Sequence, residues 1–205
     1  MEAARRSRLR RLHSIAGVVP VGGFLAFHLL VNAQAARGAD AYNAMSAKLQ
    51  ALPLAVALEI LVIAVPIFFH GIYGLFVTAT EAPGEGRPGR GRRALSVFQR
   101  ATGVLLFAFV LFHLWTARLV QVRDHESLDL FRLMQAVLSS PWKHAVYVAG
   151  LIGATAHLSA GLYTFADAWG LARRRVVRIA VAAAAALVFA VLTGLGLTSL
   201  DAFRL

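Results

Sequence analysis

Five long apolar runs decide most of what this chain can fold into. The runs cover roughly residues 14–33, 54–78, 97–118, 145–166 and 178–198. Each is long enough for a helix that crosses the ~30 Å hydrocarbon layer of a bilayer, which takes ~20 residues. With 59% hydrophobic residues, the chain is also too apolar for an ordinary soluble domain. The sequence therefore predicts an all-α integral membrane protein, with residues 1–205 forming a single five-helix domain.

The net charge of +11 is distributed unevenly. Five arginines lie in residues 1–13, five in residues 87–100 around the start of the third run, and four after the fourth run. Alternating membrane crossings put 14 of the 21 lysines and arginines on one side. The positive-inside rule then predicts a cytoplasmic N-terminus and an outside C-terminus in the cell inner membrane. The distribution favours contacts with membrane lipid and argues against a nucleic-acid partner.

The first run also has features of a secretory signal. Basic residues precede it, and Ala33-Gln34-Ala35 resembles a cleavage site. However, the run is long for such a segment and contains His28 and Asn32. We expect it to remain in the protein as the first membrane helix.

Four histidines lie about two-thirds of the way along four separate runs. They are His28, His70, His113 and His157. An ionisable residue at membrane depth is expensive and usually functional, and a neutral imidazole is a good ligand for haem iron. A single membrane histidine is more often a packing or proton-relay residue, but four at matched depths favour two bis-histidine haem sites. Without a C-x-x-C-H motif, both haems would be of the b type.

Helix geometry pairs these histidines by depth. A rise of 1.5 Å per residue places His28 ~21 Å from the inner end of its helix. His113 reaches a similar height on a helix of the same direction, whereas His70 and His157 lie in the inner half. The expected pairs are therefore His28 with His113 and His70 with His157. These are the diagonals of an up-down bundle of the first four helices around two stacked haems, with the fifth helix as a packing element.

A weak internal repeat supports this arrangement. The second and fourth runs both contain His-x-x-x-Gly-Leu, beginning at His70 and His157. In the first and third runs, Gly17-Val18 and Gly103-Val104 precede the histidine at nearly equal spacing. Small residues near a ligand allow a flat macrocycle to approach the backbone, although glycines can also simply permit close helix packing.

Outside the membrane runs, the sequence predicts a loop at residues 79–96, which are rich in glycine, proline and arginine. Residues 39–51 and 128–139 have the apolar spacing of short amphipathic helices on the outer face. We expect both helices to cap the bundle.

Three further residues are candidates for supporting roles. His13 lies at the inner mouth of the first helix and Arg100 enters the third, so both can reach a propionate of the inner haem. An interfacial role for His13 and a topology role for Arg100 are equally compatible with the sequence. Glu59 precedes His70 by three helical turns and lies ~16 Å further out. It is a candidate for proton exchange with quinone, or a carboxylate that only hydrogen-bonds within the bundle.

Several strings along the chain resemble a known family, the five-helix dihaem cytochrome b anchors of succinate dehydrogenases and fumarate reductases. They are Arg11-Leu12-His13-Ser14, Pro20-Val21-Gly22, His28-Leu29, Val31-Asn32, Ala35-Ala36-Arg37-Gly38, Leu58-Glu59-Ile60, Gln99-Arg100, Thr102-Gly103, Leu138-Ser139-Ser140-Pro141 and Trp169-Gly170. The resemblance covers nearly the whole chain, and the strings are specific only when taken together.

The resemblance implies a role for each of these sites. The inner haem would be held by His70 and His157, and the outer haem by His28 and His113. Succinate chemistry would belong to a flavoprotein subunit, and an iron–sulfur subunit would dock on the cytoplasmic face. This chain would pass electrons through both haems to quinone, usually menaquinone in such anchors, near the outer face. Glu59 matches a family glutamate implicated there, and the complexes can form higher oligomers.

Two other readings remain open from the sequence. The chain can be a dihaem cytochrome b anchor of another quinone-linked enzyme, such as a hydrogenase, formate dehydrogenase or nitrate reductase. Alternatively, it can be a haem-free membrane anchor whose histidines relay protons. The identity of the co-purifying subunits and the haem absorbance distinguish these three functions.

Overall fold

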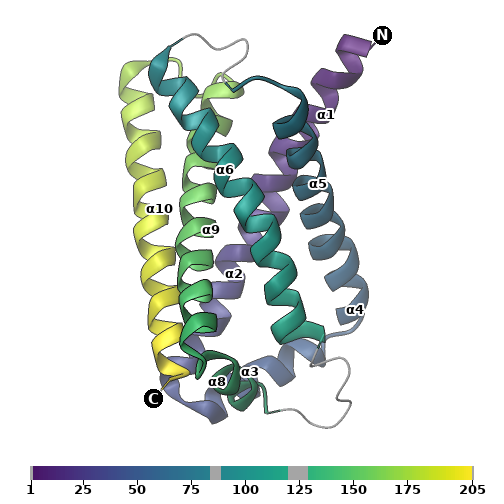
Figure 1. Cartoon of the computed structure of the whole chain (residues 1–205), viewed down its shortest axis with the longest axis vertical. Coiled ribbons are helices and arrows are strands. Elements are labelled where there is room, and N and C mark those ends of the chain that lie inside the picture. Colours follow the sequence, from purple (N-terminus) through teal and green to yellow (C-terminus); the bar gives the residue numbers. More distant parts are fainter. Residues whose placement is uncertain (1, 84–88, 120–128, 205) are drawn as a thin grey trace.

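The computed structural model describes residues 2–83, 89–119 and 129–204, and every regular element in these ranges is a helix. Five of the helical segments are long and apolar enough to span a membrane: Arg6–Arg37, Ala55–Thr80, Arg90–Leu119, Pro141–Ala168 and Arg175–Ala202. The five predicted membrane helices are therefore confirmed. The N-terminus and C-terminus lie at opposite ends of the bundle (Figure 1), which we call the N-terminal end and the C-terminal end.

The first membrane helix changes its hydrogen-bonding pattern along its length. It consists of α1 (Glu2–Ala16), the π-helical segment η1 (Gly17–Val21), α2 (Gly22–Asn32) and the 3-10 turn η2 (Ala33–Arg37). Pro20 lies inside η1. Because proline has no N–H to donate, the regular α-helical ladder cannot continue through this position.

The second and third membrane helices also contain π-helical segments. The second consists of α4 (Ala55–Leu58), η3 (Glu59–Ala64) and α5 (Val65–Thr80). The third consists of α6 (Arg90–His113) and η4 (Leu114–Leu119). Such π segments are rare and often lie at functional sites, and Glu59 begins one of these two.

The fourth and fifth membrane helices are regular over their whole length. They are α9 (Pro141–Ala168) and α10 (Arg175–Ala202). Pro141 occupies the first turn of α9, where its missing N–H costs nothing. The α9 helix ends at Ala168, and the positive φ of 71° at Gly170 reverses the chain just beyond it. Backbone bonds from Leu171 to Ala166 (2.9 Å) and from Gly170 to Asp167 (3.2 Å) close this turn.

The first four membrane helices form an up-down ring. Around it, α1 contacts α5, α5 contacts α6, α6 contacts α9, and α9 returns to the first helix through η1. The first helix therefore lies diagonally opposite the third, and the second opposite the fourth, as predicted. The fifth helix, α10, packs on the outside against α9 and α2 (Figure 1).

Two short helices close the C-terminal end. They are α3 (Ala39–Gln50) and α8 (Leu130–Leu138), which contact each other. Both predicted amphipathic helices are thus present, except that residue 128 lies outside the described residues. Asp129 accepts a hydrogen bond from the Arg132 amide (3.0 Å) and so caps α8.

The predicted loop at residues 79–96 is shorter in the structure. The α5 helix continues to Thr80 and α6 already begins at Arg90, while residues 84–88 lie outside the described residues. The difference arises because hydropathy detects only the apolar part of a helix. The first turns of α6 carry exposed arginines that extend beyond the apolar segment.

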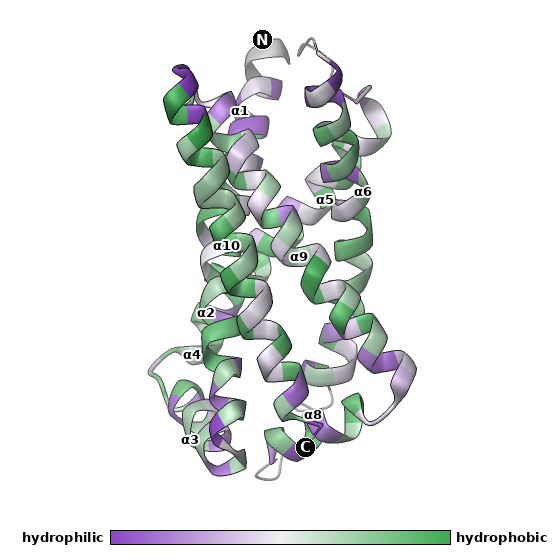
Figure 2. Cartoon of the chain, turned by 90° about the vertical axis from the view of Figure 1, so that its left-hand side faces the viewer, coloured by the Kyte–Doolittle hydropathy of each residue, from purple (hydrophilic) through white to green (hydrophobic). Residues whose placement is uncertain are grey.

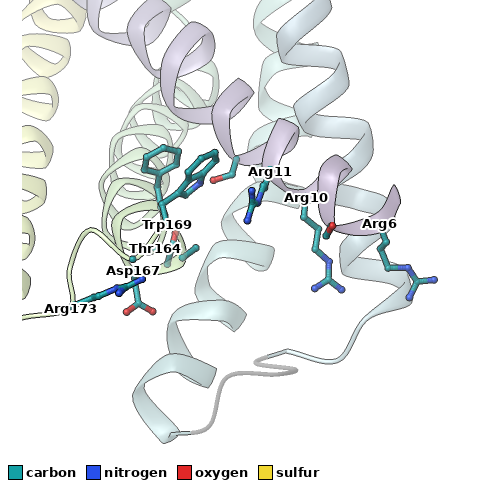
Figure 3. Close-up of a pocket in the computed structure, with 12 residues that line it drawn as sticks. Arg6, Arg10, Arg11, Thr164, Asp167, Trp169 and Arg173 are labelled. Carbon is teal, nitrogen blue, oxygen red and sulfur yellow. The ribbon is translucent and has the colours of Figure 1, made fainter. Parts of the chain in front are cut away.

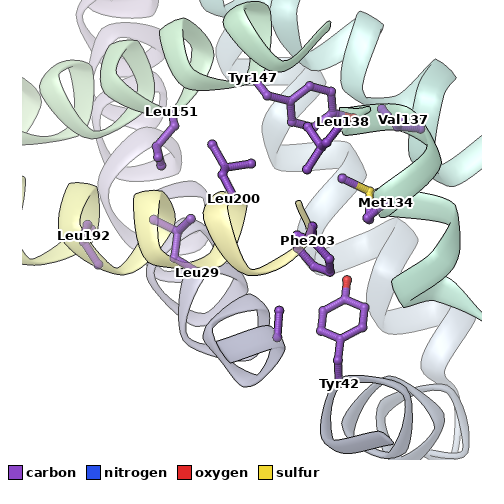
Figure 4. Packing of buried hydrophobic residues seen from close by; sticks show 11 residues of the cluster. Leu29, Tyr42, Met134, Val137, Leu138, Tyr147, Leu151, Leu192, Leu200 and Phe203 are labelled. Atoms are coloured by element: carbon purple, nitrogen blue, oxygen red, sulfur yellow. The ribbon is translucent and has the colours of Figure 1, made fainter. Parts of the chain in front are cut away.

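The best-packed apolar cluster lies toward the C-terminal end. There Phe203 and Leu138 are each only 1% exposed, and Tyr42 is 8% exposed (Figure 4). By contrast, α5 has no buried residue. Apolar residues cover the long sides of the bundle, and hydrophilic residues gather toward its ends (Figure 2). Apolar side chains exposed along the sides would be unfavourable in water but are favourable in contact with lipid.

Candidate functional site

The structure brings the four membrane histidines together in the two pairs expected from depth. His70 on α5 faces His157 on α9, with ring centroids 6.2 Å apart and ring planes at 83°. His28 on α2 faces His113 at the end of α6, with centroids 5.7 Å apart and planes at 78°. In each pair the partners come from diagonal helices, so both pairs lie across the centre of the four-helix ring.

These separations suit two axial ligands of one metal. An imidazole nitrogen binds a metal ion at about 2 Å, so the centres of two rings on opposite sides of one ion lie about 6 Å apart. Both observed separations are close to this value. The described residues contain no group of three or more histidines or carboxylates that could hold a bare metal ion. Haem iron, however, needs only two side-chain ligands, because the macrocycle supplies the others.

Hydrogen bonds orient three of the four rings. His70 Nδ1 donates to the carbonyl of His13 (3.0 Å), and His157 Nδ1 contacts Thr102 Oγ1 (2.8 Å). The Thr102 hydroxyl donates to the Phe98 carbonyl (2.7 Å) and so accepts from His157. Each Nδ1 therefore carries the proton, which leaves the lone pair on Nε2. A second partner of this kind is typical of histidines that bind a metal.

The third oriented ring is that of His113. Its Nδ1 lies 3.3 Å from the hydroxyl oxygen of Tyr147, which in turn contacts Thr116 Oγ1 at 2.7 Å. Since Thr116 donates to the carbonyl of Phe112 (3.0 Å), its oxygen accepts from Tyr147. The Tyr147 oxygen can then accept a hydrogen bond from His113 Nδ1, so the lone pair of His113 is again on Nε2.

His28 is held by its backbone and by a ring neighbour. Its carbonyl accepts a hydrogen bond from Asn32 Nδ2 (2.7 Å), and its ring lies 5.4 Å from that of Phe24. The amide oxygen of Asn32 accepts from the Tyr42 hydroxyl (3.3 Å). This chain of contacts ties the end of α2 to α3 and fixes the height of His28.

Glycines lie directly against the rings of the first pair. A Cβ at Gly17 would overlap the His70 ring, and one at Gly103 would lie 3.4 Å from His157 Cε1. Gly74, one turn beyond His70, faces His13 Nε2 at 3.2 Å from its Cβ position. The glycines that accompany the histidines in the sequence therefore let the imidazole rings pack directly against the backbone of a neighbouring helix. The fit to a haem rests on the two facing histidine pairs.

His13 belongs to the same site as His70. The two rings stack with centroids 4.1 Å apart and planes within 2° of parallel. His13 Nε2 is buried and, among the described residues, has no hydrogen-bond partner. A buried polar atom without a partner is costly, which makes it a candidate contact for a polar group of a bound cofactor.

Arg100 is engaged by the backbone that follows α5. Its guanidinium donates to the carbonyl of Glu81 and, at 3.1 Å, to that of Ala82. These contacts place Arg100 at the N-terminal end of the bundle and close the end of α5. The structure thus assigns it a role in the protein fold that the sequence did not indicate.

Glu59 forms an ion pair that sequence reasoning missed. Arg118 Nε contacts Glu59 Oε1 at 2.6 Å, and Arg118 Nη2 contacts Oε2 at 2.5 Å. This two-point geometry is the strong form of an arginine–carboxylate pair. Glu59 lies near the start of the second membrane helix and Arg118 near the end of the third, which places the pair toward the C-terminal end. Their side chains are 39% and 36% exposed.

A signal for Arg118 was present in the sequence. Arg118 ends the third run and Glu59 lies near the start of the second, and these two points meet at one end of an up-down bundle. Applying the depth argument to opposite charges as well as to histidines would have paired them. Thr102 and Tyr147 gave no such signal, because single hydroxyl residues are common in membrane helices.

Comparisons with known proteins identify the family of this chain. The family described as succinate dehydrogenase/fumarate reductase transmembrane subunit matches residues 91–195. The succinate dehydrogenase cytochrome b558 subunit of Bacillus subtilis (strain 168) is 39% identical over 171 residues, which is 83% of this chain and 84% of that protein. No solved structure matches the chain. The family match and the extensive similarity show that this chain belongs to the transmembrane cytochrome b subunits of succinate dehydrogenase and fumarate reductase.

Proposed function

We propose that this chain is the dihaem, quinone-reacting subunit of a succinate:quinone oxidoreductase. His70 and His157 would bind one haem b, and His28 and His113 the other. The observation that carries the proposal is the meeting of four histidines in two pairs, both at the separation of axial ligands. Each haem would supply a one-electron carrier, and together they would connect the two ends of the bundle.

The protein's own residues would prepare these sites for binding. Thr102, Tyr147 and the His13 carbonyl accept hydrogen bonds from Nδ1 of three imidazoles, which leaves Nε2 as the nitrogen that would bind iron. Gly17 and Gly103 let the rings of the His70–His157 pair lie directly against the backbone of the first and third membrane helices. The apolar helices around both pairs would exclude water.

Haem propionates at the N-terminal end would be met by His13 and Arg100. His13 Nε2 is buried beside His70 and can donate a hydrogen bond to a carboxylate. A guanidinium has five N–H donors, so the two carbonyl contacts of Arg100 leave donors for a propionate. Both residues belong to the end of the bundle closer to the His70–His157 pair.

The charge distribution supports one orientation of the chain in the membrane. The N-terminal end, which carries most of the arginines, would face the cytoplasm and receive the iron–sulfur subunit, with the flavoprotein bound beyond it. The C-terminal end would then face outward and react with quinone. We propose that this quinone is menaquinone. There Glu59 would exchange protons with the quinone, and Arg118 would hold its carboxylate in place.

A spectroscopic experiment on the purified complex tests the proposal. The dithionite-reduced minus oxidised spectrum is recorded, haem is quantified per chain, and the reduction is repeated with succinate. We expect two b haems per chain, with at least one reduced by succinate. Absence of haem from the assembled complex would contradict the proposal and favour a haem-free anchor.

The partner subunits distinguish the remaining alternative. A co-purifying subunit with flavin supports a succinate-linked complex. Two haems that succinate cannot reduce, together with a molybdenum or nickel–iron partner, would assign the chain to another quinone-linked oxidoreductase.

A further inference from the structure

A large basic pocket opens at the N-terminal end of the bundle. It has a volume of about 730 Å³ and lies between α1 and the turn that follows α9 (Figure 3). We call it the arginine pocket, and the residues that define it are Arg6, Arg10, Arg11, Asp167, Trp169 and Arg173. Its volume is within the range of small-molecule sites.

The local fold explains why these arginines converge. Arg6 and Arg10 share one face of α1, since positions four apart lie one above the other on a helix, and the adjacent Arg11 also lines the pocket. Arg173 comes from the other wall, because the positive φ of Gly170 turns the chain back after α9. The Arg173 guanidinium passes close to Gly170, where a Cβ would lie 3.1 Å from its Nε.

The charge of the pocket is positive and only partly neutralised. Arg10 pairs with Glu81 at 2.6 Å, and Asp167 pairs with Arg92 at 3.5 Å. Arg11 lies over the ring of Trp169, 5.6 Å from its centroid, and this contact orients the guanidinium without cancelling its charge. Within the described residues, no ion pair joins Arg11 or Arg173 to a carboxylate.

Negative partial charge at the end of α9 opposes the binding of an anion in this pocket. The end of α9 presents carbonyl groups and the negative end of the helix dipole, about half an elementary charge. The turn satisfies the last carbonyls through the amides of Gly170 and Leu171, and the charges of Arg11 and Arg173 outweigh the remaining negative charge. The pocket therefore favours an anion with several oxygen acceptors, which arginine binds well.

The surroundings of the pocket indicate that this anion belongs to a lipid. Phe165 and Trp169 stack on its floor with centroids 5.3 Å apart. Just beyond, Leu171 is 61% exposed and Val176, at the start of α10, is 77% exposed. Aromatic residues, arginines and exposed apolar side chains occur together at the membrane–water interface, and basic pockets between membrane helices bind anionic lipid headgroups.

We propose that the arginine pocket binds the phosphate headgroup of an anionic phospholipid, with Arg11 and Arg173 as its principal contacts. The lipid would join α1 to the end of α9 across the bundle. The proposal does not depend on haem or quinone, because it uses none of the residues assigned to them.

Lipid retained by the purified complex tests this proposal. The complex is purified in mild detergent, and bound phospholipid is extracted and quantified by mass spectrometry. The double variant Arg11→Gln/Arg173→Gln is compared with Arg90→Gln/Arg93→Gln, whose arginines are exposed at the start of α6 outside the pocket. We expect anionic lipid to bind at least about tenfold more weakly to the pocket variant, because each lost charged hydrogen bond exceeds the free energy of a tenfold change. The control should retain it.

Two further measurements test lipid binding without relying on variants that could fail to fold. The variant Arg11→Lys/Arg173→Lys keeps both charges but loses the planar fork, so we expect intermediate lipid retention. Thermal unfolding of the wild-type complex is also followed with added phosphatidylglycerol, phosphatidylcholine or inorganic phosphate. A rise in Tm with phosphatidylglycerol alone supports the proposal.

Three outcomes would overturn it. Equal effects of phosphatidylcholine would show that the headgroup charge is not recognised, and equal effects of inorganic phosphate would show a site for small anions. If the pocket variant loses its partner subunits yet retains anionic lipid, the arginines form a protein interface instead.

Discussion

The two histidine pairs have similar ring separations but different surroundings. In the His70–His157 pair, both rings have a hydrogen-bond acceptor for Nδ1, and glycines lie against both imidazoles. In the His28–His113 pair, only His113 has such an acceptor among the described residues. Aromatic rings surround this second pair, with Phe24 beside His28 and Phe109 and Tyr147 beside His113.

This difference shows that the same ligand type and spacing can create two unlike sites. An acceptor at Nδ1 makes the imidazole a more basic ligand, and the polarity of the shell affects the potential of the metal. A pair near the arginine-rich end also experiences a different field from one near the C-terminal end. We therefore expect the two haems to differ in potential and to be separable by substitution.

The largest expected effect comes from the histidines themselves. Replacing His70 or His157 with Gln should remove one haem, and replacing His28 or His113 should remove the other, because each iron loses an axial ligand. Haem per chain would fall from two to one, and the remaining absorption band would depend on the pair altered. His144→Gln, in the first turns of α9, is the control and should keep both haems. A variant of any of the four that retains two haems would contradict the pairing.

The next prediction concerns the ion pair at the C-terminal end. Glu59→Gln should lower quinone reduction by about 100-fold, since proton exchange at the quinone would lose its carboxylate. Reduction of the haems by succinate should remain. Arg118→Gln should act in the same direction, and Arg118→Lys less strongly. Asp40→Asn, an exposed carboxylate in α3, is the control. Normal quinone turnover in both Glu59 and Arg118 variants would exclude this role.

The third prediction is that a methyl group added beside one histidine pair weakens haem binding at that pair alone. Gly17→Ala places a methyl group against the His70 ring, and such overpacking costs about 1–3 kcal/mol. We expect the haem of the His70–His157 pair to bind about tenfold more weakly, while the other haem is unchanged. Gly23→Ala is the matched control, because a Cβ there meets nothing within 4 Å. Equal haem loss in both variants would point to general instability.

Loss of a hydrogen-bond acceptor should change the reduction potential of one haem without removing that haem. Thr102→Val removes the acceptor for His157, and Tyr147→Phe removes the acceptor for His113. The less basic ligand stabilises ferric iron less, so the potential of the affected haem should rise by a few tens of millivolts, equivalent to about 1 kcal/mol. Potentiometric titration measures both haems at once. Thr102→Ser should behave as the wild type, and a shift of the wrong haem would contradict the assignment.

The smallest effect is expected away from both pairs, at the cap of α8. Asp129→Ala should lower stability by about 1 kcal/mol without changing the haem spectrum. The hydrogen bond from the Arg132 amide, together with that from Asn43, lowers the pKa of Asp129. Because the folded-state pKa is depressed, this stabilisation is complete above the unfolded pKa of about 3.9 and is lost as pH falls through the folded value. Thermal melts at pH 6 and pH 3.5 would show a smaller difference between wild type and variant at the lower pH.

Much of the membrane architecture could be predicted from the sequence. Five runs of sufficient length determine five helices, because the bilayer core leaves the backbone few alternatives. The fixed rise of a helix converts the positions of His28, His70, His113 and His157 into depths. The depths select which histidines can meet, and the structure brings together the same two pairs.

Other features depended on contacts that no local pattern contains. The sequence made Arg100 a candidate propionate contact or a topology anchor, but it gave no sign that its guanidinium also contacts the carbonyls of Glu81 and Ala82. Neither Thr102 nor Tyr147 was distinguishable from other hydroxyl residues until the helices were packed. The pair between Glu59 and Arg118 also requires that two π-helical segments bring their side chains to the same point.

The sequence by itself thus determined the number of membrane helices, their direction and the heights of the histidines, because hydrophobic length and helix rise are properties of each segment alone. The tertiary structure alone decided which atoms accept hydrogen bonds from Nδ1 of the histidines. It also decided that Arg118 pairs with Glu59 and that Arg11 and Arg173 line one pocket. These outcomes depend on how helices rotate and approach one another, and that is determined by packing among all of them.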